Sequence, residues 1–499
     1  MPGPLITAPP TTLGAALQHV ASTAGAATAL QGDFGCLSWA ALWNQVAPVA
    51  ARLRSVAVAG REPGTPLQAH AVALRPDRDE IVVLLAHALA GIPLLPLHPA
   101  LPEAEAQRLA DAAAARRLSV AQCLEPGPLV PACAPEVQPD DDLFWVPTSG
   151  SSGPPKLARL THRAVLAAAA ALTERLPFGA HDRWILTLPL SHVGGLSVVL
   201  RCVCAMRPIV LVPRFAETAV WTAIVRDGGT RLSAVPAIAH RLLADEAHHA
   251  DLARLNLVML GGQAAPQALR QALADAGVPA VASYGLTESC AAAACETTAE
   301  AGQLLPGCGT ALRGMAIRIS GPDGHVLPAG ATGSIHLRGT ALLAGYVSHP
   351  DPVAPQAFDG QGWMDTGDLG WLDADGRLHV QGRRSEVIVT GGEKVVPGVV
   401  EAALREHPAV RDAVVFALPD QRWGAIVCAA VEAPAALAHD ASLPALLATL
   451  LPPWARPRQL VCLEALPRLN TGKVDRRGTP ALAAPRLVDW PLHAGLPCR

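Results

Sequence analysis

The sequence predicts an α/β fold whose large N-terminal part contains layered α/β subdomains and a β-rich subdomain. Ala- and Leu-rich helical segments alternate with short runs of apolar and β-branched residues, a pattern typical of helices packed on a parallel sheet. From residue 302 the predicted strands become shorter and are separated by Gly/Asp turns. Because 499 residues exceed what one hydrophobic core usually supports, we expect two or three domains.

The interior strands are predicted from short apolar runs with Gly or Pro at their boundaries. These runs are residues 185–188, 209–212 and 257–260. Residues 81–89 are predicted to form an amphipathic or buried helix. The most apolar stretch, residues 193–213, is interrupted by glycines and arginines. It therefore predicts a buried helix followed by a strand, and not a membrane span.

The C-terminal part is predicted to be a small α+β unit of about 100 residues. Just before it, residues 373–376 (Asp-Ala-Asp-Gly) predict the turn of a β-hairpin. Within the unit, a helix is predicted over 399–406 and a strand over 412–417. We therefore expect an N-terminal domain over residues 1–384 and a C-terminal domain over residues 385–499.

The composition excludes some classes of function. The formal net charge is only −3, which gives no field to attract nucleic acid or an anionic membrane. The 11 cysteines are odd in number, scattered and without metal-ligand spacing, which favours free thiols in a reducing compartment. The N-terminus lacks the basic flank and apolar core of a signal peptide. A cytoplasmic protein is expected, and its oligomeric state does not follow from the sequence.

The strongest functional signal is Pro-Thr-Ser-Gly-Ser-Ser-Gly-Pro-Pro-Lys at residues 147–156. Its glycines let backbone amides approach an oxyanion, its hydroxyls donate hydrogen bonds, and Lys156 supplies a mobile charge. It is not a Walker loop, because Lys156 is followed by Leu157 rather than by Ser or Thr. Taken alone, the segment is either a phosphate-binding loop for ATP or a Gly/Ser/Pro surface loop.

Four further segments point to the same chemistry. They are Ser-Tyr-Gly-Leu-Thr-Glu at 283–288, Gly-Trp-Met-Asp-Thr-Gly-Asp at 362–368, Gly-Arg-Arg-Ser-Glu at 382–386 with Gly-Gly-Glu at 391–393, and Pro-Arg-Leu-Asn-Thr-Gly-Lys at 467–473. Together with the first loop, they resemble the motifs of the adenylate-forming superfamily of acyl-CoA synthetases, carrier-loading adenylation domains and luciferases. The resemblance runs from residue 144 to residue 477, and five motifs in the family's order are not expected by chance.

The resemblance implies an AMP-forming acid–thiol ligase that uses ATP, Mg²⁺ and the co-substrate coenzyme A. A carboxylate attacks the α-phosphorus of ATP, which gives an acyl-adenylate and pyrophosphate, and the acyl group then passes to CoA. The barrier to the first step is mainly one of positioning and charge neutralisation. The resemblance assigns the β- and γ-phosphates to Thr148, Ser149, Gly150, Ser151, Ser152, Gly153 and Lys156. The glycine that usually follows the lysine is Leu157 here, which implies an altered exit from the loop.

The adenine site and the metal site are also implied by the resemblance. The adenine site is assigned to Gly261, Gly262, Gln263, Tyr284 and Gly285, with the Tyr284 ring stacked on the base. Thr287 is expected to contact the α-phosphate. Glu288 is expected to hold Mg²⁺, a cation that suits carboxylate and phosphate oxygens. Outside this motif, an isolated glutamate would more simply be a solvated turn acid.

Three side chains are assigned to the rest of the nucleotide. Asp368 would accept both ribose hydroxyls, Arg383 would contact ribose or phosphate, and Lys473 would bring positive charge to the α-phosphate. A point charge on a flexible stem suits a residue that must leave between two half-reactions. Without the resemblance, Asp368 would be interpreted as a turn acid and Lys473 as a solvated surface lysine.

The resemblance further implies that the C-terminal domain is mobile. Ser385 occupies the hinge position, where many members of the superfamily have an acidic residue. Rotation about this hinge would replace Lys473 by Gly391 and Gly392, which match the loop that lines the pantetheine tunnel.

The acyl site is assigned to the segment Leu-Pro-Leu-Ser-His-Val-Gly-Gly-Leu at 188–196. No aspartate follows to hold a substrate amine, so aminoacyl chemistry is not favoured. This segment, the Gly-Gly-Gln loop, the hinge motif and the short chain are most similar to the o-succinylbenzoate–CoA ligases of menaquinone biosynthesis. Another aryl- or fatty-acid–CoA ligase is the alternative. The predicted acyl-site residues are His192, which is also a catalytic candidate, Gly194, Gly195, Ser197 and Arg201.

Arg201 is a lone cation in an apolar segment, nine residues after His192. Such a charge is costly unless it meets an anion or reaches solvent. Because o-succinylbenzoate has two carboxylates, Arg201 is a candidate partner for the one that is not activated. The alternatives are a structural ion pair or a side chain that extends to the surface.

A nucleotide-binding or regulatory protein that has lost catalysis is the alternative from a different class. The sequence argues against it, because the charged residues that the reaction needs are all present. These are Lys156, Glu288, Asp368, Arg383 and Lys473.

Overall fold

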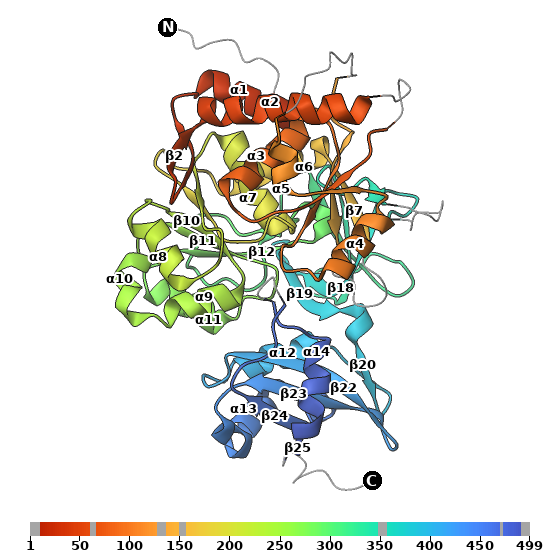
Figure 1. Cartoon of the computed structure of the whole chain (residues 1–499). Helices are drawn as coiled ribbons and strands as arrows, with labels where there is room; N and C mark the ends of the chain where they lie inside the picture. The colour runs from red at the N-terminus through yellow and green to blue at the C-terminus, as the bar shows by residue number, and fades with distance from the viewer. Residues whose placement is uncertain are drawn as a thin grey trace.

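The computed structural model describes residues 10–59, 66–126, 136–148, 156–347, 357–469 and 473–490. Figure 1 shows two stacked α/β sheets, a smaller antiparallel sheet, and a C-terminal unit at one end of the molecule. The predicted α/β class with a β-rich region and a small α+β unit is confirmed. None of the described helices combines the length and the hydropathy that a membrane span requires.

The larger sheet has nine strands within the described residues. They are β1 (Thr28–Gly32), β2 (Gly35–Ser38), β8 (Trp184–Leu186), β9 (Ile209–Leu211), β10 (Arg231–Ala234), β11 (Leu257–Leu260), β12 (Ala280–Tyr284), β13 (Ala294–Cys295) and β14 (Thr310–Ala311), in the order β14-β13-β12-β11-β10-β8-β9-β1-β2. The strands from β12 to β1 are parallel, and antiparallel strands close both edges. The three predicted interior strands are thus confirmed. The first of them ends at Leu186, because the chain turns before Pro189.

The second sheet carries the predicted phosphate loop. Its strands are β17 (Gly345–Tyr346), β7 (Leu157–Thr161), β6 (Asp142–Pro147), β4 (Leu94–Leu97), β3 (His70–Ala73) and β5 (Arg116–Leu118), in this spatial order. The strands β3 to β6 are parallel, while β7 is antiparallel to both of its neighbours. The loop at 148–156 therefore connects the two strands of a hairpin.

Helices cover both faces of both sheets. They are α1 (Leu13–Thr23), α2 (Trp39–Val58), α3 (Arg78–Ala90), α4 (Glu103–Ala112), α5 (Val120–Leu124), α6 (His162–Arg175), α7 (Val193–Ala205), α8 (Glu217–Val225), α9 (Pro236–Leu243), α10 (His249–Leu252) and α11 (Gln267–Asp275). The helix predicted at 81–89 lies within α3, and the helix and strand predicted over 193–213 are found as α7 and β9.

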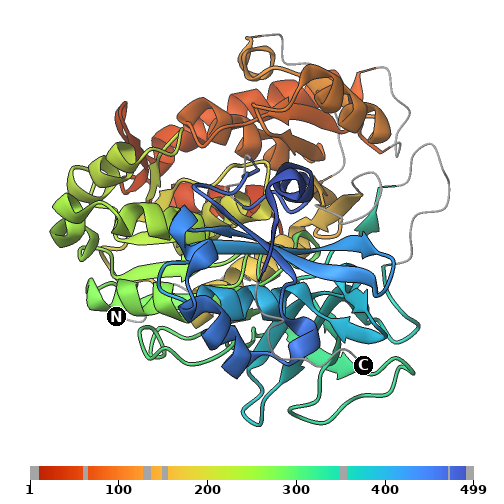
Figure 2. The ribbon, with the colours of Figure 1, turned by 90° about the horizontal axis from the view of Figure 1, so that it is seen from below.

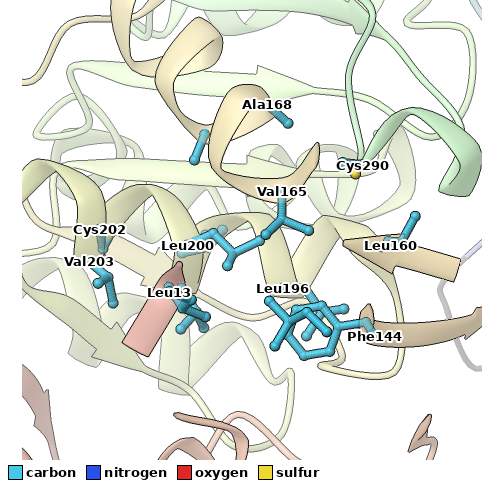
Figure 3. Close-up of a cluster of buried hydrophobic side chains, with 14 of the residues drawn as sticks. Leu13, Phe144, Leu160, Val165, Ala168, Leu196, Leu200, Cys202, Val203 and Cys290 are labelled. Carbon is cyan, nitrogen blue, oxygen red and sulfur yellow. The ribbon is translucent and has the colours of Figure 1, made fainter. Parts of the chain in front are cut away.

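The two sheets enclose a common core. Successive residues of a strand face opposite sides, so Trp184 enters the core shared with α6 and α7, while Ile185 enters the core under α8, α9 and α11. Figure 3 shows part of the shared core, where Phe144 of β6 and Leu160 of β7 meet Val165 of α6 and Leu196 of α7. On the far side of the second sheet, α4 covers a third core. The result is five alternating layers of helices and strands.

The β-rich region is an antiparallel sheet of four strands among the described residues. They are β15 (Met315–Ser320), β16 (Gly333–Gly339), β18 (Met364–Leu372) and β19 (Leu378–Arg383), in this order. The predicted hairpin turn at 373–376 joins β18 to β19, with Gly376 at φ +75°. This sheet matters for the site, because β18 carries Asp368 and β19 ends at Arg383.

The C-terminal unit has cores of its own. Its main elements are β20 (Ile388–Thr390), β21 (Glu393–Val395), α12 (Pro397–Arg405), β22 (Asp412–Asp420), β23 (Gly424–Glu432), α13 (Ser442–Leu450), β24 (Gln459–Leu463), α14 (Gly478–Ala483) and β25 (Val488–Asp489). Figure 2 shows it in front of the layered part when the molecule is seen from below. The predicted helix and strand at 399–406 and 412–417 appear as α12 and β22. The boundary at residue 384 and the mobility of the unit stay predictions.

A buried ionic cluster joins the large sheet to the β-rich sheet. The Glu296 side chain is fully buried and contacts Arg270 of α11 at 2.8 Å and Arg377, next to β19, at 2.9 Å. One of its carboxylate oxygens also accepts a hydrogen bond from the Ala282 amide of β12 at 2.7 Å. Removal of the carboxylate would leave two guanidinium groups buried without their common partner.

We therefore expect Glu296→Ala to destabilise the fold by about 3–5 kcal/mol, the usual cost of breaking a buried ion pair from one side. The matched control is Glu174→Ala, because the Glu174–Arg313 pair is exposed and should contribute less than about 1 kcal/mol. Scanning calorimetry of both variants checks this, and equal shifts in their melting temperatures would contradict the assignment.

Candidate active site

Three predicted site loops lie at one edge of the large sheet. β8, β11 and β12 run in the same direction through β10, so their carboxyl ends point to the same side. The segments that follow them are residues 187–192, 261–263 and 285–288. The crevice outside the carboxyl ends of parallel strands is where α/β proteins commonly bind ligands.

Asp368 links this edge to the β-rich sheet. It is 5% exposed and accepts a 2.6 Å hydrogen bond from the Tyr284 hydroxyl at the end of β12. Its other oxygen contacts Arg383 Nε at 3.0 Å, and Arg383 also donates to the Thr366 carbonyl at 2.8 Å. Burial raises the pKa of Asp368, while Arg383 opposes the shift. Burial also raises the pKa of Tyr284 well above its ordinary value, so the phenol stays a donor.

Lys473, from the C-terminal unit, reaches this same edge. A Cβ atom placed on Gly262 would lie 3.0 Å from Lys473 Cε, and Gly262 has φ +77°, a conformation that favours glycine. Burial and then the charge of Arg383 lower the pKa of Lys473. The His192 pKa falls to about 4 through burial and then through the charges of Lys473 and His98. The structure therefore brings Lys473, Gly262, Arg383 and His192 together.

The other residues of the predicted adenine platform follow β11 and β12 closely. The Gly261 amide donates to the Ala234 carbonyl at 3.2 Å, and a Cβ at Gly261 would lie 2.8 Å from Ser283 Oγ. A Cβ at Gly285 would lie only 2.0 Å from the Ala291 carbonyl oxygen. Gln263 is half-buried in the same loop. These glycines let the backbone fold tightly at the strand ends.

Glu288 lies beside the hairpin of β6 and β7, called the phosphate hairpin below because its connection carries the predicted phosphate loop at 148–156. The hairpin is closed by the Thr148 amide, which donates to the Lys156 carbonyl at 2.8 Å. The Lys156 amine lies 5.1 Å from the centre of the Tyr346 ring, and the Tyr346 hydroxyl donates to Glu288 Oε1 at 3.1 Å. Thr287 opens the same short 3₁₀ turn. One tyrosine thus joins the loop lysine to the predicted metal ligand.

The other predicted loop residues, Ser149, Gly150, Ser151, Ser152 and Gly153, lie outside the described residues. Leu157, which replaces the family's usual glycine, is 3% exposed and begins β7. It packs with Leu95, Leu97 and Leu109 in the core under α4. The altered exit from the loop is therefore a strand residue anchored in the core.

The predicted acyl segment forms a tight entry into α7. His192 is its N-cap. A Cβ at Gly195 would lie 2.3 Å from the Pro189 carbonyl oxygen, and one at Gly194 would lie 3.1 Å from Leu188 Cδ1. The Ser197 hydroxyl donates to the Gly194 carbonyl at 3.2 Å. Gly195 is thus needed for the close approach of the loop to the helix, whereas a Cβ at Gly194 would meet only the end of a flexible leucine side chain.

Arg201 is buried in the shared core, with 1% exposure. Its Nε donates to the Ser197 carbonyl at 3.0 Å, and its Cζ lies 3.9 Å from the centre of the Trp184 ring. Its Nη2 donates to Ser233 Oγ at 3.4 Å. Among the described residues no carboxylate forms an ion pair with it, and burial lowers its pKa to about 10. Its side chain does not reach the surface, and in the described segments it has no acidic partner.

The predicted pantetheine loop is a two-residue hairpin turn. Gly391 and Gly392 join β20 to β21 with φ +57° and +87°, as a type I′ turn requires. The Gly391 amide donates to the Trp423 carbonyl at 2.9 Å, and a Cβ at Gly391 would lie 2.6 Å from the Trp423 ring.

The predicted hinge lies between two ion pairs. Arg384, on one side of Ser385, contacts Asp365 of β18 at 2.6 Å. Glu386, on the other side, contacts Arg476 of the C-terminal unit at 3.1 Å. The backbone at Ser385 therefore separates a residue attached to the β-rich sheet from one attached to the C-terminal unit.

Tyr346 is the site neighbour that sequence reasoning missed. It lies in none of the five motifs, and it is 58 residues away from Glu288 in the sequence. The sequence contains one signal for Tyr346: the chain has only two tyrosines, and the resemblance assigns the other, Tyr284, to the adenine site.

Two family models and several known proteins match the chain. The AMP-binding enzyme model matches residues 117–347, and the model of the AMP-binding enzyme C-terminal domain matches residues 399–473. The chain is 39% identical over 357 residues to a probable 2-succinylbenzoate–CoA ligase of Mycobacterium tuberculosis, and this match covers 68% of this chain and 84% of that protein. It is 35% identical over 353 residues to an indoleacetate–CoA ligase of Aromatoleum aromaticum, which covers 70% of this chain and 69% of that protein.

A solved structure matches most of the fold. The o-succinylbenzoate CoA synthetase MenE of Bacillus subtilis, in complex with the acyl-adenylate intermediate OSB-AMP, has a TM-score of 0.79 at 26% identity, with 92% of this chain and 96% of that chain covered. The motifs, the layered fold and these matches agree. The chain belongs to the AMP-binding enzyme family and is an acid–CoA ligase of the adenylate-forming superfamily.

Proposed function

We propose that this ligase converts o-succinylbenzoate to o-succinylbenzoyl-CoA through an acyl-adenylate, a step of menaquinone biosynthesis. The observation that carries the proposal is the buried guanidinium of Arg201, which has no carboxylate partner among the described residues. A dicarboxylic substrate supplies such a partner and keeps its second carboxylate for activation. The relative of Mycobacterium tuberculosis and the Bacillus subtilis structure support the same substrate.

Adenylation would use the edge where Lys473 meets Gly262. Lys473 would neutralise charge that develops at the α-phosphate, and Thr287 would donate to the same group. Asp368, fixed by Tyr284 and Arg383, would accept the ribose hydroxyls. His192, whose pKa of about 4 keeps it neutral, would contact the acid near the α-phosphate without repelling Lys473.

Mg²⁺ fits the residues present if Glu288 is its protein ligand. The described residues contain no group of three His, Cys, Asp or Glu side chains placed to hold a metal ion. Mg²⁺ usually takes one or two carboxylates together with substrate phosphates, so a single glutamate beside the phosphate hairpin is sufficient. When bound, the ion would supply charge neutralisation at the phosphates.

Thioester formation would follow rotation about Ser385. The ion pairs of Arg384 and Glu386 on either side support a pivot at this residue and a domain boundary after residue 384. Rotation would withdraw Lys473 and bring Gly391 and Gly392 to the site, where their bare backbone would line the path of the CoA pantetheine. The cytoplasm, where both co-substrates are available, is the proposed location.

A ligase for another aryl acid is the second candidate. The 35% identity to an indoleacetate–CoA ligase favours it. Release of pyrophosphate with a panel of acids separates the two, because o-succinylbenzoate should exceed benzoate, indoleacetate and fatty acids in kcat/KM. Preference for a monocarboxylic acid would refute the proposed substrate.

Lys473→Ala should slow adenylation on the order of 10²–10³-fold, the scale of removing one aligned charge from a transition state. It should still transfer the acyl group from supplied acyl-adenylate to CoA, because Lys473 serves only the first half-reaction. Single-turnover assays of both half-reactions measure this. An equal loss in both steps would contradict the exchange of Lys473 for the glycine loop.

Glu288→Gln should abolish Mg²⁺-dependent turnover with little change in melting temperature, because the amide keeps the shape of the side chain but loses the ligand charge. Activity across a Mg²⁺ titration, together with thermal unfolding, tests this. A sharp fall in melting temperature, with residual activity that tracks the folded fraction, would make Glu288 structural.

Arg201→Leu should raise the KM for o-succinylbenzoate at least about tenfold, equivalent to about 1.4 kcal/mol, with ATP affinity unchanged. Benzoate is the matched control substrate, because it lacks the second carboxylate and its KM should not change. An unchanged KM for o-succinylbenzoate in a well-folded variant would remove Arg201 from the acyl site.

A further inference from the structure

Both tyrosines of the chain donate hydrogen bonds to carboxylates of the candidate site. Tyr284 donates to Asp368 at 2.6 Å and Tyr346 donates to Glu288 at 3.1 Å. The chain contains no other tyrosine. The first pair belongs to the predicted nucleoside site, whereas the second lies between the phosphate hairpin and the predicted metal ligand.

The position of Tyr346 is set by the backbone. β17 pairs with β7 in antiparallel register, with Tyr346 opposite Ala158 and Gly345 opposite Arg159. The phosphate hairpin ends only two residues before Ala158, at Lys156. The backbone pairing of β17 with β7 therefore holds Tyr346 against the exit strand of that hairpin.

The Tyr346 hydroxyl lies 3.1 Å from Glu288 Oε1 and donates a hydrogen bond to it. A hydrogen bond to one oxygen of a carboxylate fixes its plane, and outer partners of this kind orient metal ligands in many proteins.

The Tyr346 ring also contacts the positively charged amine of Lys156. The Lys156 amine lies 5.1 Å from the ring centre, within the range of a cation–π contact. Lys156 and Glu288, both in the described part of the chain, form no direct ion pair. Such a pair would neutralise the carboxylate that a cation needs and the amine that a phosphate needs.

We propose that Tyr346 is a positioning residue for MgATP, which orients Glu288 toward the divalent cation and keeps Lys156 apart from Glu288. The inference rests on the proposed role of Glu288 in the function above. Tyr346 touches neither the acyl group nor the α-phosphate in this scheme and acts only through its two neighbours.

Because there are only two tyrosines, fluorine NMR gives a direct test. Protein labelled with 3-fluorotyrosine should show two resonances, which Tyr346→Phe and Tyr284→Phe assign. The protein is first saturated with α,β-methylene-ATP, which cannot transfer its adenylyl group to an acid, and Mg²⁺ is then added. The Tyr346 resonance should move with Mg²⁺, and the Tyr284 resonance should stay in place.

Tyr346→Phe keeps the ring over Lys156 and removes only the hydroxyl. It should raise the Mg²⁺ midpoint about tenfold, as the loss of an outer partner of a metal ligand does, and leave kcat at saturating Mg²⁺ close to that of the parent. Isothermal calorimetry with the same ATP analogue measures the midpoint without turnover. The matched control, Tyr284→Phe, should weaken binding of the analogue and leave the Mg²⁺ midpoint unchanged.

The outcomes separate this inference from the proposed function. If Glu288→Gln abolishes the Mg²⁺ response while Tyr346→Phe leaves the midpoint unchanged, Tyr346 has no positioning role and the metal assignment stands. If neither variant changes the response, the metal assignment fails together with the inference. A Tyr346→Phe variant that loses the same fraction of activity at every Mg²⁺ concentration would show a structural role only. The fluorine titration of the parent protein remains decisive even if the variant folds poorly.

Discussion

The shared direction of β8, β11 and β12 is the constraint on which the candidate site depends. The carboxyl ends of parallel strands lie at one edge of the sheet, so three loops that are far apart in the sequence lie at the same edge. Gly195, Gly261 and Gly285 have no space for a Cβ atom. They therefore let each loop turn sharply where its strand ends or its helix begins. The β-rich sheet is joined to this edge through Tyr284, Asp368 and Arg383, and the Glu296 cluster holds the two sheets together behind it.

The electrostatics of the edge favour an anion. Lys473 is half-buried beside Arg383, and both its burial and that neighbouring charge lower its pKa. Bringing an ammonium group into such a position is unfavourable unless negative charge arrives with it. A triphosphate would reverse both effects, because its charge favours the protonated lysine. Nucleotide binding and docking of the C-terminal unit are therefore expected to stabilise each other, since each supplies the charge that the other lacks.

Much of the fold could be predicted from local pattern, whereas the site could be predicted only in part. The interior strands at 209–212 and 257–260 are short apolar runs, and the pattern alone places them. The partners of Asp368 and Lys473 lie on other strands and in another unit, so no local pattern contains them. Tyr346 contacts Glu288 only because a two-residue strand pairs with the exit of the phosphate hairpin. The sequence alone indicates that Leu157 departs from the family's usual glycine. Its burial in the core under α4 could not be predicted, because that core is formed by residues of other elements.

Arg201 shows why a buried charge carries more information than an exposed one. In the described structure its guanidinium meets a carbonyl, a hydroxyl and the face of Trp184, and these are dipolar partners without formal charge. Dipoles and a ring satisfy its N–H groups but leave its charge uncompensated, whereas the neighbouring Arg231 has Asp182 at 2.6 Å. Of these two arginines near the Trp184 ring, Arg231 has an acidic partner, whereas Arg201 has none among the described residues. A fold that needed Arg201 for stability alone would gain by giving it such an acid or by replacing it with an apolar residue. An anion that comes and goes, such as the second carboxylate of the proposed substrate, would compensate this charge, and this is why we propose Arg201 as a substrate contact.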